Sequence, residues 1–408
     1  MVRCDEKNDC IILCLILIIS TLTACDDVGE VSYKAELVNQ RVLDGNSQFA
    51  IDIFKTLSKE DQGKNIFISP FSISAALTMT YNGAETTTKE VMESVLGYSG
   101  IDRDLVNESY KHLLEYLKNA DSKIELDIAN SIWAKEGKEI KEEFLEKNRD
   151  SFSAQIESLD FSRDEAVEII NNWISEATKG KIDEMLEPPI PPEVIMYLIN
   201  AIYFKGEWSE EFDPKDTKDE PFTTYDSKEQ IVSMMSRKGK IEYAQGEGYK
   251  AVRLPYGKGK VSMYCVLPDE DITIDEFIDN MTIERWYEIR DKMNEVDELE
   301  LKIPKFKLEY GIKNLNDSLI ALGMEEAFTD RADFSGIMDN VCISRVLHKA
   351  VIEVNEEGSE AAAATVVEIR ETAAMEPISF IADRPFLFFI SDDQSGTILF
   401  MGKLLEVE

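Results

Sequence analysis

The sequence is poor in the residues that most catalytic and metal sites need. It holds two histidines, His112 and His348, among 408 residues. Six cysteines are present, but no Cys-x-x-Cys pair occurs and four of the six lie in the first 25 residues. These counts exclude a multi-histidine metal site, a zinc ribbon and a disulfide framework, so neither a metal nor a cofactor is expected. The other two cysteines, Cys265 and Cys342, lie in apolar runs and are predicted to be buried.

Basic charge is also scarce. Lys and Arg number 44 against 80 Asp and Glu, which gives a formal charge of −36. Nucleic acid is not an expected partner, because every phosphate contact would have to overcome this repulsion. The 44% hydrophobic and 30% charged residues are ordinary for a globular protein, and disorder is not predicted.

Long apolar runs are confined to one N-terminal segment. Residues 11–24 read IILCLILIISTLTA, which is shorter than the roughly 20 residues a spanning helix needs but typical of a signal segment. The run ends in Leu-Thr-Ala-Cys, which resembles the lipobox of prokaryotic lipoproteins and implies lipidation at Cys25. Acidic residues outnumber Arg3 and Lys7 before the run, which departs from that pattern. An ordinary signal, cleaved or retained, and a cytoplasmic protein therefore stay open.

The rest of the chain reads as one unit. No Gly-, Ser- or Pro-rich stretch is long enough to separate domains, and no repeat of 20–50 residues occurs. We expect residues 1–24 to be a signal segment, 26–45 a short acidic tether and 46–408 a single domain. The protein is then expected outside the cytoplasmic membrane, secreted or held there by a lipid anchor.

Helical patterns come first and strand patterns later. Apolar spacing predicts helices at 46–57, 69–82, 89–96, 105–118 and 165–178. It predicts strands at 124–133, 194–204, 251–255, 260–267, 299–307, 341–354, 386–390 and 398–404. This order favours an α+β fold with antiparallel or mixed sheets over repeated βαβ units.

Residues 356–369 alternate in an unusual way. Every second residue from Ser359 to Ile369 is small or apolar, whereas Glu360 and Glu368 lie in the opposite set. A period of two predicts a strand with one face ready for burial, although four consecutive alanines also suit a helix. The small residues would let this strand enter a packed sheet without overpacking it, with Gly358 as a backbone pivot.

At these residues the sequence resembles a family, the serpins. Five segments carry the resemblance in family order: 65–72 (NIFISPFS), 200–208 (NAIYFKGEW), 348–363 (HKAVIEVNEEGSEAAA), 383–386 (DRPF) and 400–403 (FMGK). The resemblance implies one domain with three β-sheets, eight or nine helices and an exposed reactive-centre loop. It also implies an inhibitor, not an enzyme. A serine endopeptidase cleaves the loop, stays bound as an acyl-enzyme, and is carried away when the loop inserts into the main sheet.

The same resemblance assigns roles to individual residues. It implies a shutter under the main sheet, made by Ser69, Ser72, Asn200 and His348. It implies a breach, where insertion begins, with Trp208 and a salt bridge between Lys305 and Glu356. The implied hinge comprises Glu356, Gly358, Ser359, Glu360, Ala361, Ala362, Ala363, Ala364 and Thr365.

The reactive bond is implied by counting. Seventeen residues from Glu356 place it between Thr372 and Ala373, which suits elastase-like proteases with small pockets. The alternatives are Arg370 for trypsin-like proteases, Met375 for subtilisin- or chymotrypsin-like ones, and Ala374.

The same residues bear on other classes of function. No Gly-x-Ser-x-Gly or His-Glu-x-x-His motif supports a hydrolase. A non-inhibitory serpin, acting as chaperone or carrier, and a cross-class inhibitor of cysteine proteases stay open. Heparin is not expected to activate the protein, because residues 105–118 carry two lysines against two glutamates. A monomer is expected.

Overall fold

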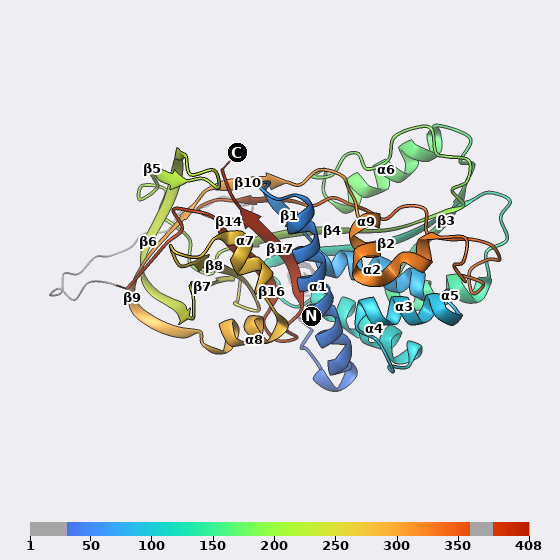
Figure 1. Cartoon of the computed structure of the whole chain (residues 1–408), viewed down its shortest axis with the longest axis horizontal. Coiled ribbons are helices and arrows are strands. Elements are labelled where there is room, and N and C mark those ends of the chain that lie inside the picture. Colours follow the sequence, from blue (N-terminus) through green and yellow to red (C-terminus); the bar gives the residue numbers. More distant parts are fainter. Residues whose placement is uncertain (1–30, 360–377, 408) are drawn as a thin grey trace, which may run out of the picture.

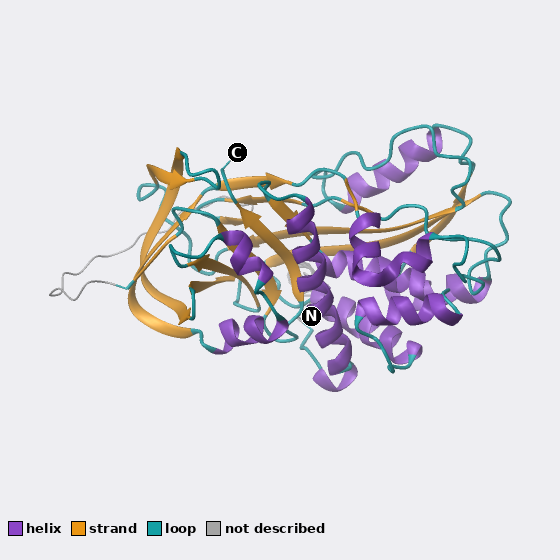
Figure 2. Cartoon of the chain, viewed as in Figure 1, coloured by secondary structure: helices purple, strands orange, loops and turns teal. Residues whose placement is uncertain are grey.

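The computed structural model describes residues 31–359 and 378–407. Helices gather around one half of the elongated molecule, and strands dominate the other (Figures 1 and 2). Nine α-helices lie in these described ranges, which agrees with the predicted number and with the α+β class. They are α1 Gln40–Glu60, α2 Pro70–Tyr81, α3 Thr86–Leu96, α4 Arg103–Lys118, α5 Glu142–Phe152, α6 Glu165–Ala177, α7 Ile274–Asp279, α8 Ile283–Asp291 and α9 Asn316–Leu319.

The first helix begins earlier than its pattern predicted. Asn39 caps α1 by accepting a hydrogen bond from the backbone of Arg41, and Val42 and Leu43 are buried. The helix therefore starts inside the stretch expected to be a tether. Before it, the described residues also contact α4, where the ring of Tyr33 packs 5.2 Å from that of Tyr116.

A four-stranded sheet runs through the helical half. Its order is β14 (Gly358–Ser359), β4 (Met196–Glu207), β2 (Ile124–Lys135) and β3 (Gln155–Leu159). Helix α2 packs against β4, and α6 packs against both β2 and β4 (Figure 1). Ser69 caps α2 by accepting a hydrogen bond from the backbone of Ser72, and Pro70 occupies the first turn, so α2 falls within the helix predicted at 69–82.

The other half is built on a nine-stranded sheet. Its order is β1 (Ile66–Ile68), β17 (Ile398–Leu404), β16 (Phe386–Asp392), β8 (Val261–Pro268), β7 (Tyr249–Tyr256), β6 (Glu229–Gly246), β9 (Asn294–Pro304) and β15 (Ser379–Ile381), with β5 (Lys218–Thr223) on β6. Strand β6 is 18 residues long and pairs with β5, β9 and β7 in turn. It thereby joins β5, β9 and β15 to the strands from β7 to β1 in one continuous sheet.

Two predicted strands are broken in the structure. The stretch 299–307 divides between β9 and β10 (Phe306–Glu309). Within 341–354 only β12 (Leu347–His348) and β13 (Val351–Val354) are strands; they pair with β11 (Lys313–Asn314) and β10. Residues 341–346 run without a ladder partner among the described residues.

The cysteine prediction was right for one residue and wrong for the other. Cys265 is buried in β8, whereas Cys342 is exposed. Val341 and Ile343 pack against the core, and Cys342 between them turns away from it.

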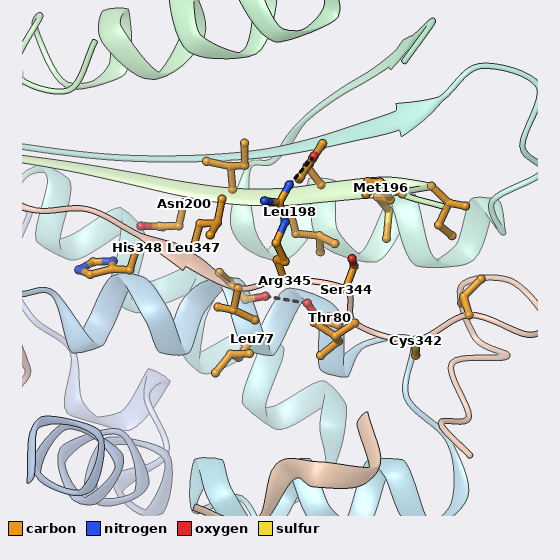
Figure 3. A pocket seen from close by; sticks show the side chains of 18 of the residues that line it. Leu77, Thr80, Met196, Leu198, Asn200, Cys342, Ser344, Arg345, Leu347 and His348 are labelled. Atoms are coloured by element: carbon orange, nitrogen blue, oxygen red, sulfur yellow. Dashed lines mark hydrogen bonds between the residues drawn. The ribbon is translucent and has the colours of Figure 1, made fainter. Parts of the chain in front are cut away.

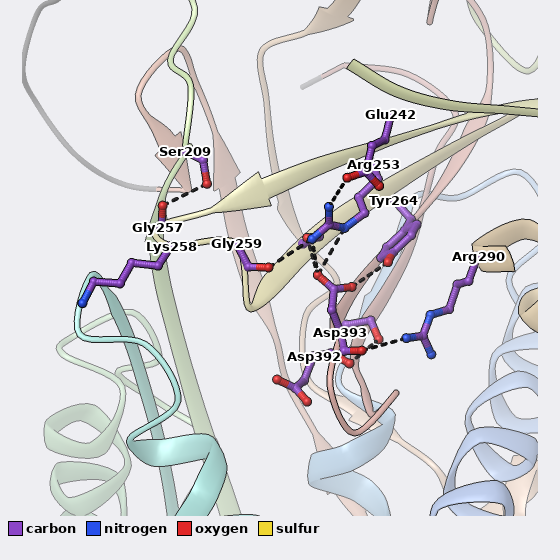
Figure 4. A network of polar contacts seen from close by, with 12 residues as sticks. Ser209, Glu242, Arg253, Gly257, Lys258, Gly259, Tyr264, Arg290, Asp392 and Asp393 are labelled. Atoms are coloured by element: carbon purple, nitrogen blue, oxygen red, sulfur yellow. Dashed lines mark hydrogen bonds and ion pairs between the residues drawn. The ribbon is translucent and has the colours of Figure 1, made fainter. Parts of the chain in front are cut away.

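A partly buried polar network braces the strand-rich half (Figure 4). The guanidinium of Arg253 lies 2.8 Å from a carboxylate oxygen of Asp393 and 2.6 Å from one of Glu242. The hydroxyl groups of Ser262 and Tyr264 also donate to Asp393. One guanidinium thus joins two carboxylates from different strands and turns, and the hydroxyl donors tie Asp393 to β8, so the network stabilises this part of the sheet.

Several predictions fall outside the described residues. They are the signal segment with Cys25, the hinge from Glu360 to Thr365, and the reactive bond at Thr372 and Ala373 with its alternatives Arg370, Ala374 and Met375. Among the helices that are described, none combines the length and the apolar character that crossing a bilayer requires.

Candidate functional site: a polar cluster and a strand edge

The four residues assigned to the shutter lie together although they are far apart in sequence. The backbone N–H of Ser69 donates to Nε2 of His348 at 3.1 Å, and its hydroxyl donates to the carbonyl of Leu399 at 2.8 Å. The hydroxyl of Ser72 donates to the amide oxygen of Asn200. The cluster therefore links α2 to β4 on one side and to β12 on the other.

His348 is held in its neutral form. Its side chain is buried, and burial lowers its pKa to about 4. The hydrogen bond from Ser69 requires an unprotonated Nε2, so geometry and burial favour the same state. Protonation would cost this contact and place a charge in the core.

One member of the polar cluster was missed in the sequence. Asn130 of β2 accepts a 2.7 Å hydrogen bond from the amide of Asn200 and donates to the carbonyl of Phe152 at 2.8 Å. Asn130 is buried. No signal in the sequence singled it out, because β2 carries other polar residues such as Asp127 and Ser131.

Trp208 holds the turn that precedes β14. Its backbone N–H donates to the carbonyl of Glu357 at 2.9 Å, and its indole N–H donates to the carbonyl of Asn355 at 3.0 Å. The indole stacks on Tyr256 with ring centroids 4.4 Å apart. The turn is thus fixed by two hydrogen bonds and one aromatic stack.

The predicted pair of Lys305 and Glu356 forms at the same turn. The ammonium nitrogen of Lys305 lies 2.8 Å from a carboxylate oxygen of Glu356. Thr217, which the sequence did not single out, donates to the other oxygen at 2.8 Å. Burial raises the pKa of Glu356, but the hydrogen bonds from Lys305 and Thr217 outweigh burial and leave it below its usual value.

The first two residues of β14 are the only described part of the hinge beyond Glu357. Gly358 pairs with Glu207 and Ser359 with Gly206 in antiparallel register. Gly358 has φ of +150°, and a Cβ there would lie 2.2 Å from the carbonyl oxygen of Gly206, so only glycine fits. Ser359 is buried, and its hydroxyl shares a 2.9 Å hydrogen bond with that of Tyr256.

Beyond Ser359, the edge of β4 that faces away from β2 has no ladder partner in the described chain. A cavity of about 120 Å³ separates this edge from residues 341–348. Its lining is mostly apolar, with Leu77 of α2, Met196 and Leu198 of β4, and Leu347 among the contributors (Figure 3). Asn200 and His348 lie at one end of it. The polar cluster thus sits where an added strand would pass.

Comparison with known proteins decides the family. The family model described as "Serpin (serine protease inhibitor)" matches residues 44–407. The chain belongs to the serpin family.

Relatives and solved structures agree with this assignment. An uncharacterized serpin-like protein of Methanosarcina acetivorans is 36% identical over 371 residues, covering 88% of this chain and 86% of that protein. The leukocyte elastase inhibitor of Bos taurus is 36% identical over 372 residues, covering 88% and 97%. The thermophilic serpin tengpin in its native state superposes with a TM-score of 0.82 at 33% identity, covering 93% of this chain and 96% of that one. The serpin fold expected from the sequence is therefore confirmed.

The predicted site residues that the structure describes lie in two groups, and each group is brought together by the fold. These are Ser69, Ser72, Asn200 and His348 in the cluster under the sheet, and Trp208, Lys305, Glu356, Gly358 and Ser359 at the turn into β14. Their roles as shutter, breach and hinge remain predictions.

Proposed function

We propose that this serpin is a suicide-substrate inhibitor of serine endopeptidases. One observation carries the proposal: β14 already pairs with β4, and the strand edge directly beyond it is unpaired in the described chain. Ala361 to Thr365, which follow after Glu360, are small, which suits insertion along this edge. Cleavage of the loop would free them to extend β14.

The physical gain from insertion is large enough to do work. Each residue added to a ladder contributes net hydrogen-bond free energy of about 1 kcal/mol, and alternate residues gain apolar burial. About 14 inserted residues at roughly 3.3 Å each would move the cut end by some 45 Å. A protease attached to that end as an acyl-enzyme would be dragged along the sheet, and its active site would be distorted before water could release it.

The hinge argues against a non-inhibitory role. Carriers and chaperones of this family lose the small residues of the hinge, whereas Ala361 to Ala364 keep them. An inhibitor of cysteine proteases would use the same insertion, so the hinge does not separate that alternative. The panel of proteases described in the next paragraph distinguishes the two alternatives.

The test is trapping. The protein is incubated with elastase-like, subtilisin-like and trypsin-like serine proteases and with a papain-like cysteine protease, and complexes are resolved in sodium dodecyl sulfate. A stable covalent complex with a serine protease supports the proposal. Loop cleavage without a complex, and without any gain in the stability of the cleaved chain, contradicts it and favours a non-inhibitory serpin. A complex with the cysteine protease alone favours the cross-class alternative.

We also propose that the protein acts outside the cytoplasmic membrane, tethered through a lipidated Cys25. Support comes from the 14-residue apolar run that ends at the Leu-Thr-Ala-Cys segment. Two acyl chains would hold the protein stably, whereas one gives only marginal binding. Cys25→Ala should release the protein into the soluble fraction or leave it unprocessed. Equal membrane partition and equal mass of variant and parent would contradict the tether.

A further inference from the structure

Residues 345–348 lie across the cavity from the unpaired edge of β4, and facing residues differ by a constant number of sequence positions. The guanidinium of Arg345 donates to the hydroxyl of Tyr197 at 3.5 Å, and these two residues are 148 positions apart. Asn200 and His348 have the same offset and meet through the Ser69–Ser72 cluster. Residues 345–348 therefore run level with residues 197–200, with the cavity between them (Figure 3).

The register of β14 determines which residue would reach each level of this edge. Ser359 pairs with Gly206 in an antiparallel ladder, so each step forward along the loop is a step backward along β4. Nine residues beyond Ser359, position 368 falls opposite Tyr197, nine residues before Gly206. Position 368 is occupied by Glu368, and Arg345 would lie on its other side.

The side of the sheet also agrees. Ser359 faces inward toward Tyr256, so even-numbered residues of an extended β14 would face the opposite side, where α6 packs. Tyr197, Ile199 and Leu347 lie on that side, in the apolar cluster of α6. Position 366, a valine, would meet Ile199 and Leu347, and the next residue on the same face is Glu368.

Arg345 has the chemistry to receive that carboxylate. Its side chain is exposed, and within the described ranges it makes no ion pair; the contact with Tyr197 is its one hydrogen bond there. A guanidinium offers five donors in a planar fork that fits a carboxylate. The figure shows it reaching from residues 341–348 toward β4 (Figure 3).

We infer that Arg345 is a positioning residue for the inserted loop, and that it binds the carboxylate of Glu368 when residues 360–369 occupy the edge of β4. The inference rests on the proposed function. The occupant is fixed by the chain itself: residues 360–377 separate Ser359 from the next described residue, and the ten residues 360–369 match the ten positions from Lys205 back to Met196. The pair would form only late in insertion, after nine residues have entered. It would therefore stabilise the final state without holding the intact protein.

The experiment exchanges the two charges. Arg345→Glu would place two carboxylates together, and the double variant Arg345→Glu with Glu368→Arg would restore an opposite pair. Arg331→Glu is the matched control, because Arg331 is exposed and lies 3.8 Å from Glu325, away from this edge. Each protein is cut in the loop with an elastase-like protease, which avoids cleavage at the new arginine. Guanidinium midpoints of intact and cut chains are then compared.

We expect Arg345→Glu to lose part of the rise in guanidinium midpoint that follows cleavage, while its intact form keeps the parental midpoint. It should also consume about twofold to fivefold more inhibitor molecules per trapped protease, because slower late insertion favours hydrolysis. The double variant should recover both values. If Arg345→Glu behaves like Arg331→Glu, or if the double variant does not recover, the pairing is wrong. If the parent itself gains nothing on cleavage and traps no protease, the proposed function fails, and the pairing fails with it.

Discussion

The ammonium nitrogen of Lys305 lies 2.8 Å from the carboxylate of Glu356, at the turn between β13 and β14. Lys305 is 40% exposed and Glu356 only 10%. The ammonium group of Lys305, on the solvent side, therefore compensates the charge of a nearly buried carboxylate. The backbone of Glu356 is held as well, since its carbonyl accepts from the N–H of Phe212 at 2.9 Å. The base of the hinge is fixed by charge and backbone together.

Lys305→Ala should lower the free energy of unfolding of the intact protein by about 1 kcal/mol, because it leaves the carboxylate of Glu356 with only Thr217 as a side-chain partner. Denaturant unfolding measures the loss. Lys307→Ala is the control, since Lys307 is exposed on β10 two residues further on. Equal losses in the two variants would mean that the ion pair contributes nothing.

The neutral state of His348 should make the intact protein sensitive to acid. The folded pKa of about 4 lies below the usual 6.5, so the unfolded state binds more protons over this interval. Stability from this residue is thus complete above about pH 6.5 and is lost as the pH falls toward 4, by at most about 3 kcal/mol. Unfolding midpoints measured between pH 7 and pH 4 test this.

His348→Gln should flatten this part of the pH profile, whereas His112→Gln, which changes the only other histidine, should leave the slope as it is. A parental slope retained in His348→Gln would assign the acid sensitivity to carboxylates instead.

The sequence predicted individual elements better than their partners. Ile398–Leu404 is a strand over the predicted residues, because its apolar run is buried throughout. Residues 341–354 show an equally clear pattern but form strands only at Leu347–His348 and Val351–Val354. Alternating burial needs only an extended chain over a core, whereas a strand needs a partner, and no local pattern reveals an unpaired edge.

The polar cluster under the sheet could be predicted only through the family. Ser69 and His348 are 279 positions apart, and no local rule connects them. Asn130 was missed because it is one of several polar residues in β2, and no local pattern distinguishes it from Asp127 or Ser131. Helix α5 was missed because it is rich in charge, and only Phe144, Asn148 and Phe152 are buried.

Ala363→Arg should turn the inhibitor into a substrate. In the register set by Ser359 and Gly206, position 363 falls opposite Ile202 and on the inward face. A charged side chain there would face the core, so insertion should slow and hydrolysis of the acyl-enzyme should win. Cleaved chain should replace covalent complex on denaturing gels. Ala363→Ser, which barely changes the volume, should keep most of the complex; an undiminished complex with arginine would refute the inward placement.

The last prediction concerns the bond that the protease attacks. Counting from Glu356 places it between Thr372 and Ala373, and a residue as small as threonine suits an elastase-like pocket. The released fragment should therefore run from Ala373 to the C-terminus, which mass spectrometry can measure. Thr372→Arg should redirect inhibition to trypsin-like proteases, because the residue before the bond sets specificity whereas the hinge sets the mechanism.

Arg370 is the internal rival to this assignment, because it already offers a trypsin site two residues earlier. Cleavage there would leave two fewer residues to insert before the acyl bond is pulled, so trypsin should mostly hydrolyse the parent loop without being trapped. Combining Thr372→Arg with Arg370→Gln removes this competing site and should raise the yield of trypsin complex further. If the parent traps trypsin efficiently and releases a fragment that begins at Glu371, then Arg370 is the bait and the count from Glu356 is two residues too long.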